Sequence, residues 1–191
     1  MTRKTARRAL VIGNSDGIGR TFTDLLLAGG WEVSGLSRSA LARTAAYAHV
    51  VCDVTEARYP ELLAQLERDR GPFDLVTHCV GIGSGLDETG LAGEPTVFET
   101  NLMSLVRAVA VLAPSMVERR AGLWIGLSSI ADDCHIADAP SYSASKAGLL
   151  ELPAGPRASR ARTRRGGDQR PVRLRRYQDG EVRRQADDDP R

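Results

Sequence analysis

Cysteine is scarce in this chain, and its spacing excludes a disulfide framework. The three cysteines are widely separated and form no C-x-x-C pair: Cys52, Cys79 and Cys134. This usage is typical of buried, reduced thiols in a cytosolic protein. The three histidines are equally scattered and do not pair at ligand spacing: His49, His78 and His135. We therefore expect no metal site.

Long apolar runs are also missing. The basic start MTRKTARR is followed only by ALVI before Gly13, which is too short for a signal-peptide core. No apolar run elsewhere approaches the length of a membrane span. These absences predict a cytoplasmic protein with no membrane partner.

The end of the chain has little apolar bulk. From Pro153 onward it contains no Ile, Met, Phe, Trp or Cys, and it carries 12 Arg against 6 acidic residues. Composition therefore predicts a disordered tail over residues 153–191. A nucleic-acid-binding arm is the functional alternative, but no aromatic residues are interleaved with the arginines, so we expect no nucleic-acid partner.

Residues 1–152 present a different pattern, in which short apolar runs alternate with helical periodicity. Five stretches are typical of buried strands: RALVIGNS, WEVSGLSRS, AHVVCDV, FDLVTHCVG and GLWIGLSS. Four segments between or after them have helical spacing: GIGRTFTDLLLAGG, YPELLAQLERDRG, residues 96–120 and SYSASKAGLLEL. Continuous apolar strands alternating with helices predict a doubly wound α/β fold with a parallel sheet, in one domain.

The first strand and helix are joined by a glycine-rich turn, VIGNSDGIG. A sharp turn that approaches a pyrophosphate closely needs glycine, and the following helix offers free N–H groups and a positive dipole end. With its G-x-x-x-G-x-G spacing, this stretch resembles the short-chain dehydrogenase/reductase family. The resemblance implies a Rossmann fold and cofactor contacts from the turn residues Gly13, Ser15, Asp16, Gly17, Ile18 and Gly19.

The resemblance also implies which dinucleotide is bound. In this family an acidic residue at the position of Ser37 favours NAD, whereas here Arg38 follows and can pair with a 2′-phosphate. Asp16 argues mildly the other way, so NADP is the expected cofactor and NAD the alternative. The resemblance further places Asp53 and Val54 at the adenine. HCVG replaces the family's N-N-A-G motif, in which Gly81 is retained, and His78 is interpreted as a packed strand-end residue.

A catalytic set follows from the same resemblance. A phenol is a reluctant proton donor at neutral pH, and a neighbouring ammonium stabilises the phenolate. In YSASK, Tyr142 and Lys146 are four residues apart and lie on one face of a helix. Tyr142 is then the acid/base, Lys146 its partner, Ser129 the carbonyl anchor and Asn101 part of a proton relay. Tyr142 and Lys146 also contact the cofactor.

After residue 152 the resemblance stops, because LPAGPR breaks the helix where the family continues to a sixth strand. We therefore expect the Rossmann fold to be incomplete there, with an open hydrophobic sheet edge and poor solubility. One hypothesis is a single-base shift near codon 152. If arginine codons are C-G-N, the shifted reading frame permits Leu at Pro156, Ala at Arg157, Gly at Arg164 and Val at Gly167. It further permits Gly at Arg173, Thr at Tyr177 and Met at Asp179. That order and spacing resemble the family's helix, sixth strand and P-G motif.

The match to the family pattern is incomplete, because Asp168 does not permit Asn and Val172 does not permit Pro. The DNA sequence around codons 150–155 tests the shift, and failure of every single-base shift to restore the pattern overturns it. The family implies an oxidoreductase acting on a carbonyl/alcohol pair, with weak or absent turnover in this chain. Its alternative is a non-catalytic dinucleotide-binding protein or remnant. Relatives are expected to be homo-oligomers, an expectation not carried over to this chain.

Overall fold

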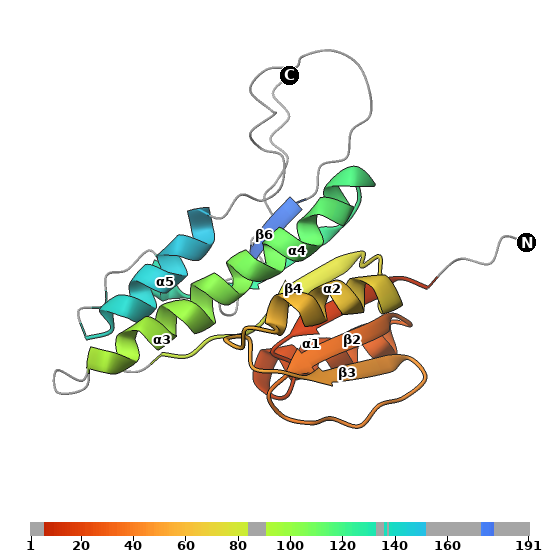
Figure 1. Ribbon diagram of the computed structural model, residues 1–191, viewed down its shortest axis with the longest axis horizontal. Helices are drawn as coiled ribbons and strands as arrows, with labels where there is room; N and C mark the ends of the chain where they lie inside the picture. The colour runs from red at the N-terminus through yellow and green to blue at the C-terminus, as the bar shows by residue number, and fades with distance from the viewer. Residues whose placement is uncertain (1–5, 84–90, 133–135, 137, 152–172, 178–191) are drawn as a thin grey trace, which may run out of the picture.

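The computed structural model describes residues 6–83, 91–132, 136, 138–151 and 173–177. Its centre is a parallel sheet in the order β3-β2-β1-β4-β5-β6 (Figure 1). The strands are β1 (Arg8–Ile12), β2 (Glu32–Ser37), β3 (Tyr47–Val51), β4 (Leu75–His78), β5 (Leu123–Leu127) and β6 (Arg173–Tyr177). The helices are α1 (Gly17–Ala28), α2 (Tyr59–Arg70), α3 (Glu94–Phe98), α4 (Ser104–Glu118) and α5 (Pro140–Glu151). Short helical turns complete the described part: η1 (Leu91–Gly93), η2 (Glu99–Met103) and η3 (Ile130–Asp132).

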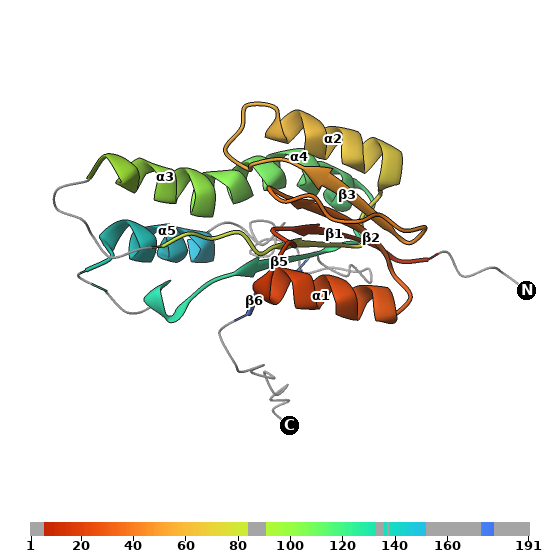
Figure 2. The same ribbon diagram turned by 90° about the horizontal axis from the view of Figure 1, so that it is seen from below.

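Alternating side chains of β1 divide the core between the two faces of the sheet. Leu10 and Ile12 pack in one cluster with residues of α2 and α4, whereas Ala9 and Val11 pack in a second cluster with residues of α1. Figure 2 shows α1 on one side of the sheet and α2 and α4 on the other. The expected doubly wound Rossmann architecture is therefore confirmed.

The strand order reverses at β1. The chain adds β2 and β3 on one side of it, then returns to add β4 and β5 on the other. Loops after β1 and β4 therefore leave the sheet in opposite directions, and such a reversal opens a crevice at the carboxyl ends of the strands. This crevice is where the cavities described below are found.

The helical segment Leu91–Glu118 is long and apolar enough to cross a membrane by length and composition alone, since an 18-residue window in it has a mean hydropathy of 1.4. The sequence-based expectation concerned uninterrupted apolar runs, whereas polar residues are interspersed in this segment. Within the fold, Leu105, Ala108, Leu112 and Met116 of this segment belong to the core cluster against the sheet. Their burial is typical of a core helix of a globular domain.

Strand β6 departs from the expectation of a tail that is disordered throughout. Residues Arg173–Tyr177 pair in parallel with Leu123–Leu127, so β5 is not the open edge that was expected. The expectation of disorder rested on low apolar content and on an excess of arginine, whereas strand pairing uses backbone groups that every residue other than proline carries in full. The predicted boundary at residue 152 stays a prediction.

Candidate active site

Two neighbouring cavities lie at the carboxyl ends of the strands and share the segment after β4, residues 79–82. The larger, of about 510 Å³, is lined by Ile18, Cys79, Val80, Gly81, Ile82, Gly83, Leu127, Ser128, Ala139, Tyr142 and Lys146. The smaller, of about 210 Å³, is lined by residues that include Gly13, Ser15, Asp16, Ser37, Arg38, Asp53 and Val54. Most of the predicted cofactor residues therefore line one cavity or the other, and Gly17 and Gly19 are the exceptions.

The turn between β1 and α1 leaves no space for side chains at two of its glycines. A Cβ at Gly13, whose φ is +84°, would lie 2.9 Å from the backbone nitrogen of Val80. A Cβ at Gly19 would lie 2.0 Å from the carbonyl oxygen of Gly13, so α1 begins directly against the turn. The side chain of Asp16 does not cap α1. Close backbone and an uncapped helix N-terminus fit the phosphates of a dinucleotide.

The smaller cavity is bounded by the ends of β2 and β3. Arg38 is exposed at this cavity, whereas Ser37 is buried and its hydroxyl donates to the carbonyl oxygen of Ser39 at 3.0 Å. The Asp53 carboxylate accepts hydrogen bonds from the backbone nitrogen and the hydroxyl of Thr55. Arg38 is therefore the exposed cationic side chain in the lining of this cavity, and its predicted pairing with a 2′-phosphate stays a prediction.

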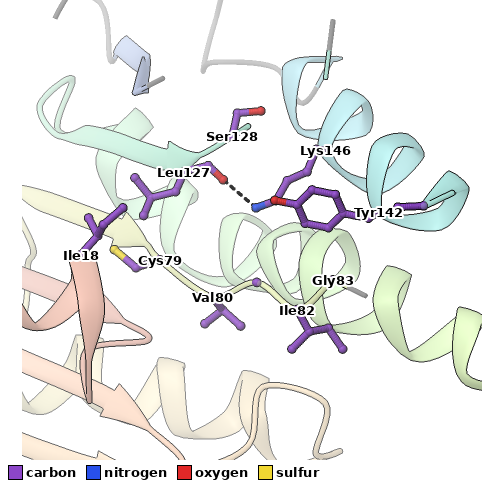
Figure 3. Close-up of a pocket in the computed structure, with 11 residues that line it drawn as sticks. Ile18, Cys79, Val80, Ile82, Gly83, Leu127, Ser128, Tyr142 and Lys146 are labelled. Atoms are coloured by element: carbon purple, nitrogen blue, oxygen red, sulfur yellow. Dashed lines mark hydrogen bonds between the residues drawn. The ribbon is translucent and has the colours of Figure 1, made fainter. Parts of the chain in front are cut away.

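Tyr142 and Lys146 extend from α5 into the larger cavity. Lys146 is 4% exposed, its Nζ donates to the carbonyl oxygen of Leu127 at 3.0 Å, and Nζ lies 5.7 Å from the centre of the Tyr142 ring. Figure 3 shows the Tyr142 hydroxyl and the Lys146 amine directed toward the same part of the cavity, beside Leu127. The helix and β5 together hold a cation beside a phenol.

Asn101 lies in η2, a π-helical turn between α3 and α4. Its amide oxygen accepts from the backbone nitrogen of Ile82 at 2.8 Å, and its amide nitrogen donates to the carbonyl oxygen of Ile82 at 2.8 Å and to the hydroxyl of Ser145 at 3.0 Å. The side chain thus joins the segment after β4 to α5, rather than lining the cavity. Its predicted part in a proton relay stays a prediction.

The predicted carbonyl anchor, Ser129, is not brought to the cavity wall. It is 8% exposed, and its hydroxyl accepts from the backbone nitrogen of Ala131 at 3.3 Å, whereas the preceding Ser128 lines the larger cavity. The spacing from Tyr142 selected Ser129, but adjacent serines at a strand end face different sides. Sequence spacing could not decide between them.

A family model for the short chain dehydrogenases matches residues 7–163, most of this chain. The chain belongs to the short-chain dehydrogenase family. This match reaches past residue 152, where sequence reasoning placed the end of the resemblance.

The most similar proteins include several bacterial reductases. An uncharacterized oxidoreductase of Myxococcus xanthus is 33% identical over 78% of this chain and 64% of its own length. The ketoacyl reductase HetN of a Nostoc species is 31% identical over 78% of this chain and 57% of its own length. A short-chain dehydrogenase of Streptomyces avermitilis superposes with a TM-score of 0.75 at 25% identity, covering 91% of this chain and 65% of the other. The chain thus spans about three fifths of the length of these relatives.

In this short-chain dehydrogenase His78 and Cys79 replace the two asparagines of the family's N-N-A-G motif; His78 is buried and Cys79 is partly buried. His78 is 1% exposed, and its Nε2 lies 2.8 Å from the hydroxyl of Ser104, as expected for a packed strand-end residue. Burial, and then the charge of Lys146, lower the pKa of His78 to about 3. Burial raises the pKa of the Cys79 thiol to about 11, so Cys79 is a neutral thiol where the two cavities meet. Neither group is charged at neutral pH.

Sequence reasoning missed two residues that position Tyr142. Ser145 donates to the carbonyl oxygen of Tyr142 at 2.8 Å while accepting from Asn101, and its place in YSASK was the available signal. Gly83 packs against the Tyr142 ring, since a Cβ there would lie 2.5 Å from Cδ2. Nothing in the glycine-rich loop distinguished Gly83 from its neighbours.

We expect Gly83→Ala to displace the Tyr142 ring and to lower kcat/KM for a carbonyl substrate about tenfold. Gly93→Ala is the matched control, because a Cβ at Gly93 meets nothing within 4 Å and its φ of −77° suits alanine. Steady-state kinetics on both variants check the expectation. Equal activities of the two variants would show that Gly83 does not set the position of the ring.

Proposed function

We propose that this chain is an NAD(P)-dependent oxidoreductase that interconverts a carbonyl group and an alcohol, with NADP as the preferred cofactor. The observation that carries the proposal is the larger cavity. It presents the phenol of Tyr142 and the buried amine of Lys146, and it shares residues 79–82 with the smaller cavity, which the glycine turn borders. Membership in the short-chain dehydrogenase family supports the same activity.

The chain's own residues account for proton transfer and for binding. In the reducing direction the Tyr142 hydroxyl donates its proton to the substrate's carbonyl oxygen, and the O–H bond of the new alcohol forms as the phenolic O–H bond breaks. The Lys146 ammonium, held by the carbonyl oxygen of Leu127, stabilises the phenolate that remains until solvent returns a proton. A bound nicotinamide would supply the hydride for the carbonyl carbon.

The preference for NADP rests on the end of β2. Ser37 supplies no carboxylate there, and Arg38 is exposed at the smaller cavity, where its guanidinium can pair with a 2′-phosphate. Asp16 lines the same cavity and weakens this preference by repulsion. The phosphates would be held by backbone N–H groups of the turn from Gly13 and of the start of α1.

The named activities of relatives supply the first substrate class to test. HetN is a ketoacyl reductase, several relatives are 3-oxoacyl-[acyl-carrier-protein] reductases, and actinorhodin polyketide ketoreductase with NADPH superposes with a TM-score of 0.69 at 25% identity. We therefore include a 3-oxoacyl thioester, such as an acetoacetyl thioester, among the carbonyl probes.

The test measures binding and turnover separately on the full 191-residue protein. Fluorescence titration gives the Kd of NADPH and NADH, and absorbance of the reduced cofactor follows turnover of the thioester and of simple ketones. Turnover with tighter binding of NADPH supports the proposal. Binding without turnover on any carbonyl favours the second candidate, a non-catalytic dinucleotide-binding protein. The observation behind this candidate is that the chain covers only part of the length of its relatives. Failure to bind either dinucleotide overturns both.

A further inference from the structure

A buried chain of polar side chains lies behind the smaller cavity. The amide nitrogen of Asn14 is 2.6 Å from the hydroxyl of Tyr47, and that hydroxyl is 2.8 Å from Nδ1 of His49. Nε2 of His49 is 2.9 Å from the carbonyl oxygen of Ser39. Asn14, Tyr47 and His49 are at most 5% exposed, so water does not compete for these hydrogen bonds.

The carbonyl oxygen of Ser39 fixes the direction of each hydrogen bond in this series of side chains. The carbonyl oxygen of Ser39 can only accept, so Nε2 of His49 carries the proton and Nδ1 of the neutral ring accepts from the Tyr47 hydroxyl. The Tyr47 oxygen then accepts from the Asn14 amide nitrogen. Burial lowers the pKa of His49 and raises the pKa of Tyr47, which keeps both groups neutral at pH 7.

The two ends of this chain lie beside segments that line the smaller cavity. Asn14 is in the turn between Gly13 and Ser15, both of which line the cavity. Ser39 follows Arg38, and its carbonyl oxygen accepts from both the Ser37 hydroxyl and His49, so the backbone on each side of Arg38 is held.

Gly35 of β2 leaves room for these hydrogen-bonded side chains. A Cβ at Gly35 would lie 2.1 Å from the amide nitrogen of Asn14 and 2.6 Å from the Tyr47 hydroxyl. The hydrogen bonds therefore pass through the space that any other residue at position 35 would fill. Such a close approach of side chains to a strand indicates a built feature rather than a chance contact.

We propose that Asn14, Tyr47 and His49 are positioning residues that hold the phosphate-binding turn and the Arg38 segment at a fixed separation, and so set both the affinity for NADPH and its discrimination from NADH. The inference rests on the proposed function, since it needs a dinucleotide in the smaller cavity. None of the three side chains lines that cavity, so each acts through its neighbours.

The test is Tyr47→Phe, with Tyr59→Phe as the matched control. Tyr59 is also buried, but its hydroxyl has no hydrogen-bond partner among the described residues. Fluorescence titration is expected to show NADPH binding weakened about tenfold in Tyr47→Phe, because a buried hydroxyl with two partners is lost. NADH binding is expected to weaken by less than about threefold, since NADH does not use Arg38. The ratio of the Kd for NADH to the Kd for NADPH therefore falls. Tyr59→Phe keeps the wild-type Kd values and ratio.

Further measurements separate positioning from folding. A lower melting temperature of Tyr47→Phe with an unchanged ratio of Kd values overturns the inference, since it assigns Tyr47 to stability alone. If Tyr47→Phe does not fold, Asn14→Ala breaks the chain at its other end and must lower the ratio in the same way. If both single variants fold, the double variant must bind NADPH no more weakly than the single variant with the higher Kd. The reason is that both substitutions interrupt the same series of hydrogen bonds. Wild-type protein that binds neither dinucleotide refutes the proposed function instead.

Discussion

Replacing Tyr142 by phenylalanine is expected to lower kcat for a carbonyl substrate by about 10²- to 10⁴-fold, the range that a positioned general acid contributes. The variant removes one oxygen and leaves the ring, so the packing of the ring against Gly83 and the place of α5 persist. The Lys146 amine keeps its hydrogen bond to the carbonyl oxygen of Leu127. Without the phenol, no group in the described lining of the larger cavity has the same place beside Lys146.

The same measurement includes NADPH binding, because loss of turnover through misfolding would also abolish binding. We expect the Kd of NADPH to change by less than about threefold, a change worth less than about 0.7 kcal/mol. Tyr59→Phe is the control for removal of a buried phenolic oxygen outside both cavities, and it should retain wild-type kcat. Wild-type turnover by Tyr142→Phe would refute the assigned proton donor.

Sequence reasoning predicted the sheet and its helices well because each depends on local pattern. Buried parallel strands are apolar throughout, as in Ala9–Ile12, and all four of these residues are fully buried. The turn after β1 needs glycine for reasons of backbone space that are visible in the sequence. The i, i+4 spacing of Tyr142 and Lys146 places both side chains on one helical face, and both line one cavity.

The features that sequence reasoning missed depend on contacts between distant segments. The hydrogen bond between Asn14 and Tyr47 joins residues 33 positions apart, and it forms because β2, which lies between β1 and β3, carries a glycine at position 35. The direction of the Asn101 side chain depends on a π-helical turn that no periodicity indicated. Strand β6 has an arginine-rich sequence, so its pairing with β5 could not be read from apolar pattern.

Acidification is expected to destabilise the protein through His78, a buried base that stays neutral when folded. Its pKa is about 3 in the folded protein, because of burial and the charge of Lys146, and about 6.5 in the unfolded chain. Between these values the unfolded chain binds more protons, so this contribution to stability is fully present above pH 6.5 and is lost as the pH falls toward 3. The loss amounts to about 2 kcal/mol between pH 7.5 and pH 5.0, a large share of a typical domain's stability.

Urea unfolding at pH 7.5 and pH 5.0, on the wild type and on His78→Gln, isolates this contribution. The glutamine amide can take the place of Nε2, which donates to Ser104 because the Ser104 hydroxyl itself donates to the carbonyl oxygen of Thr100 at 2.5 Å. Each protein is compared with itself at two pH values, so any loss of stability in the variant at neutral pH cancels. His49 contributes in the same direction in both proteins, since burial lowers its pKa too. The variant should therefore lose about 2 kcal/mol less than the wild type on acidification, and an equal loss in both would show that folding does not lower the pKa of His78.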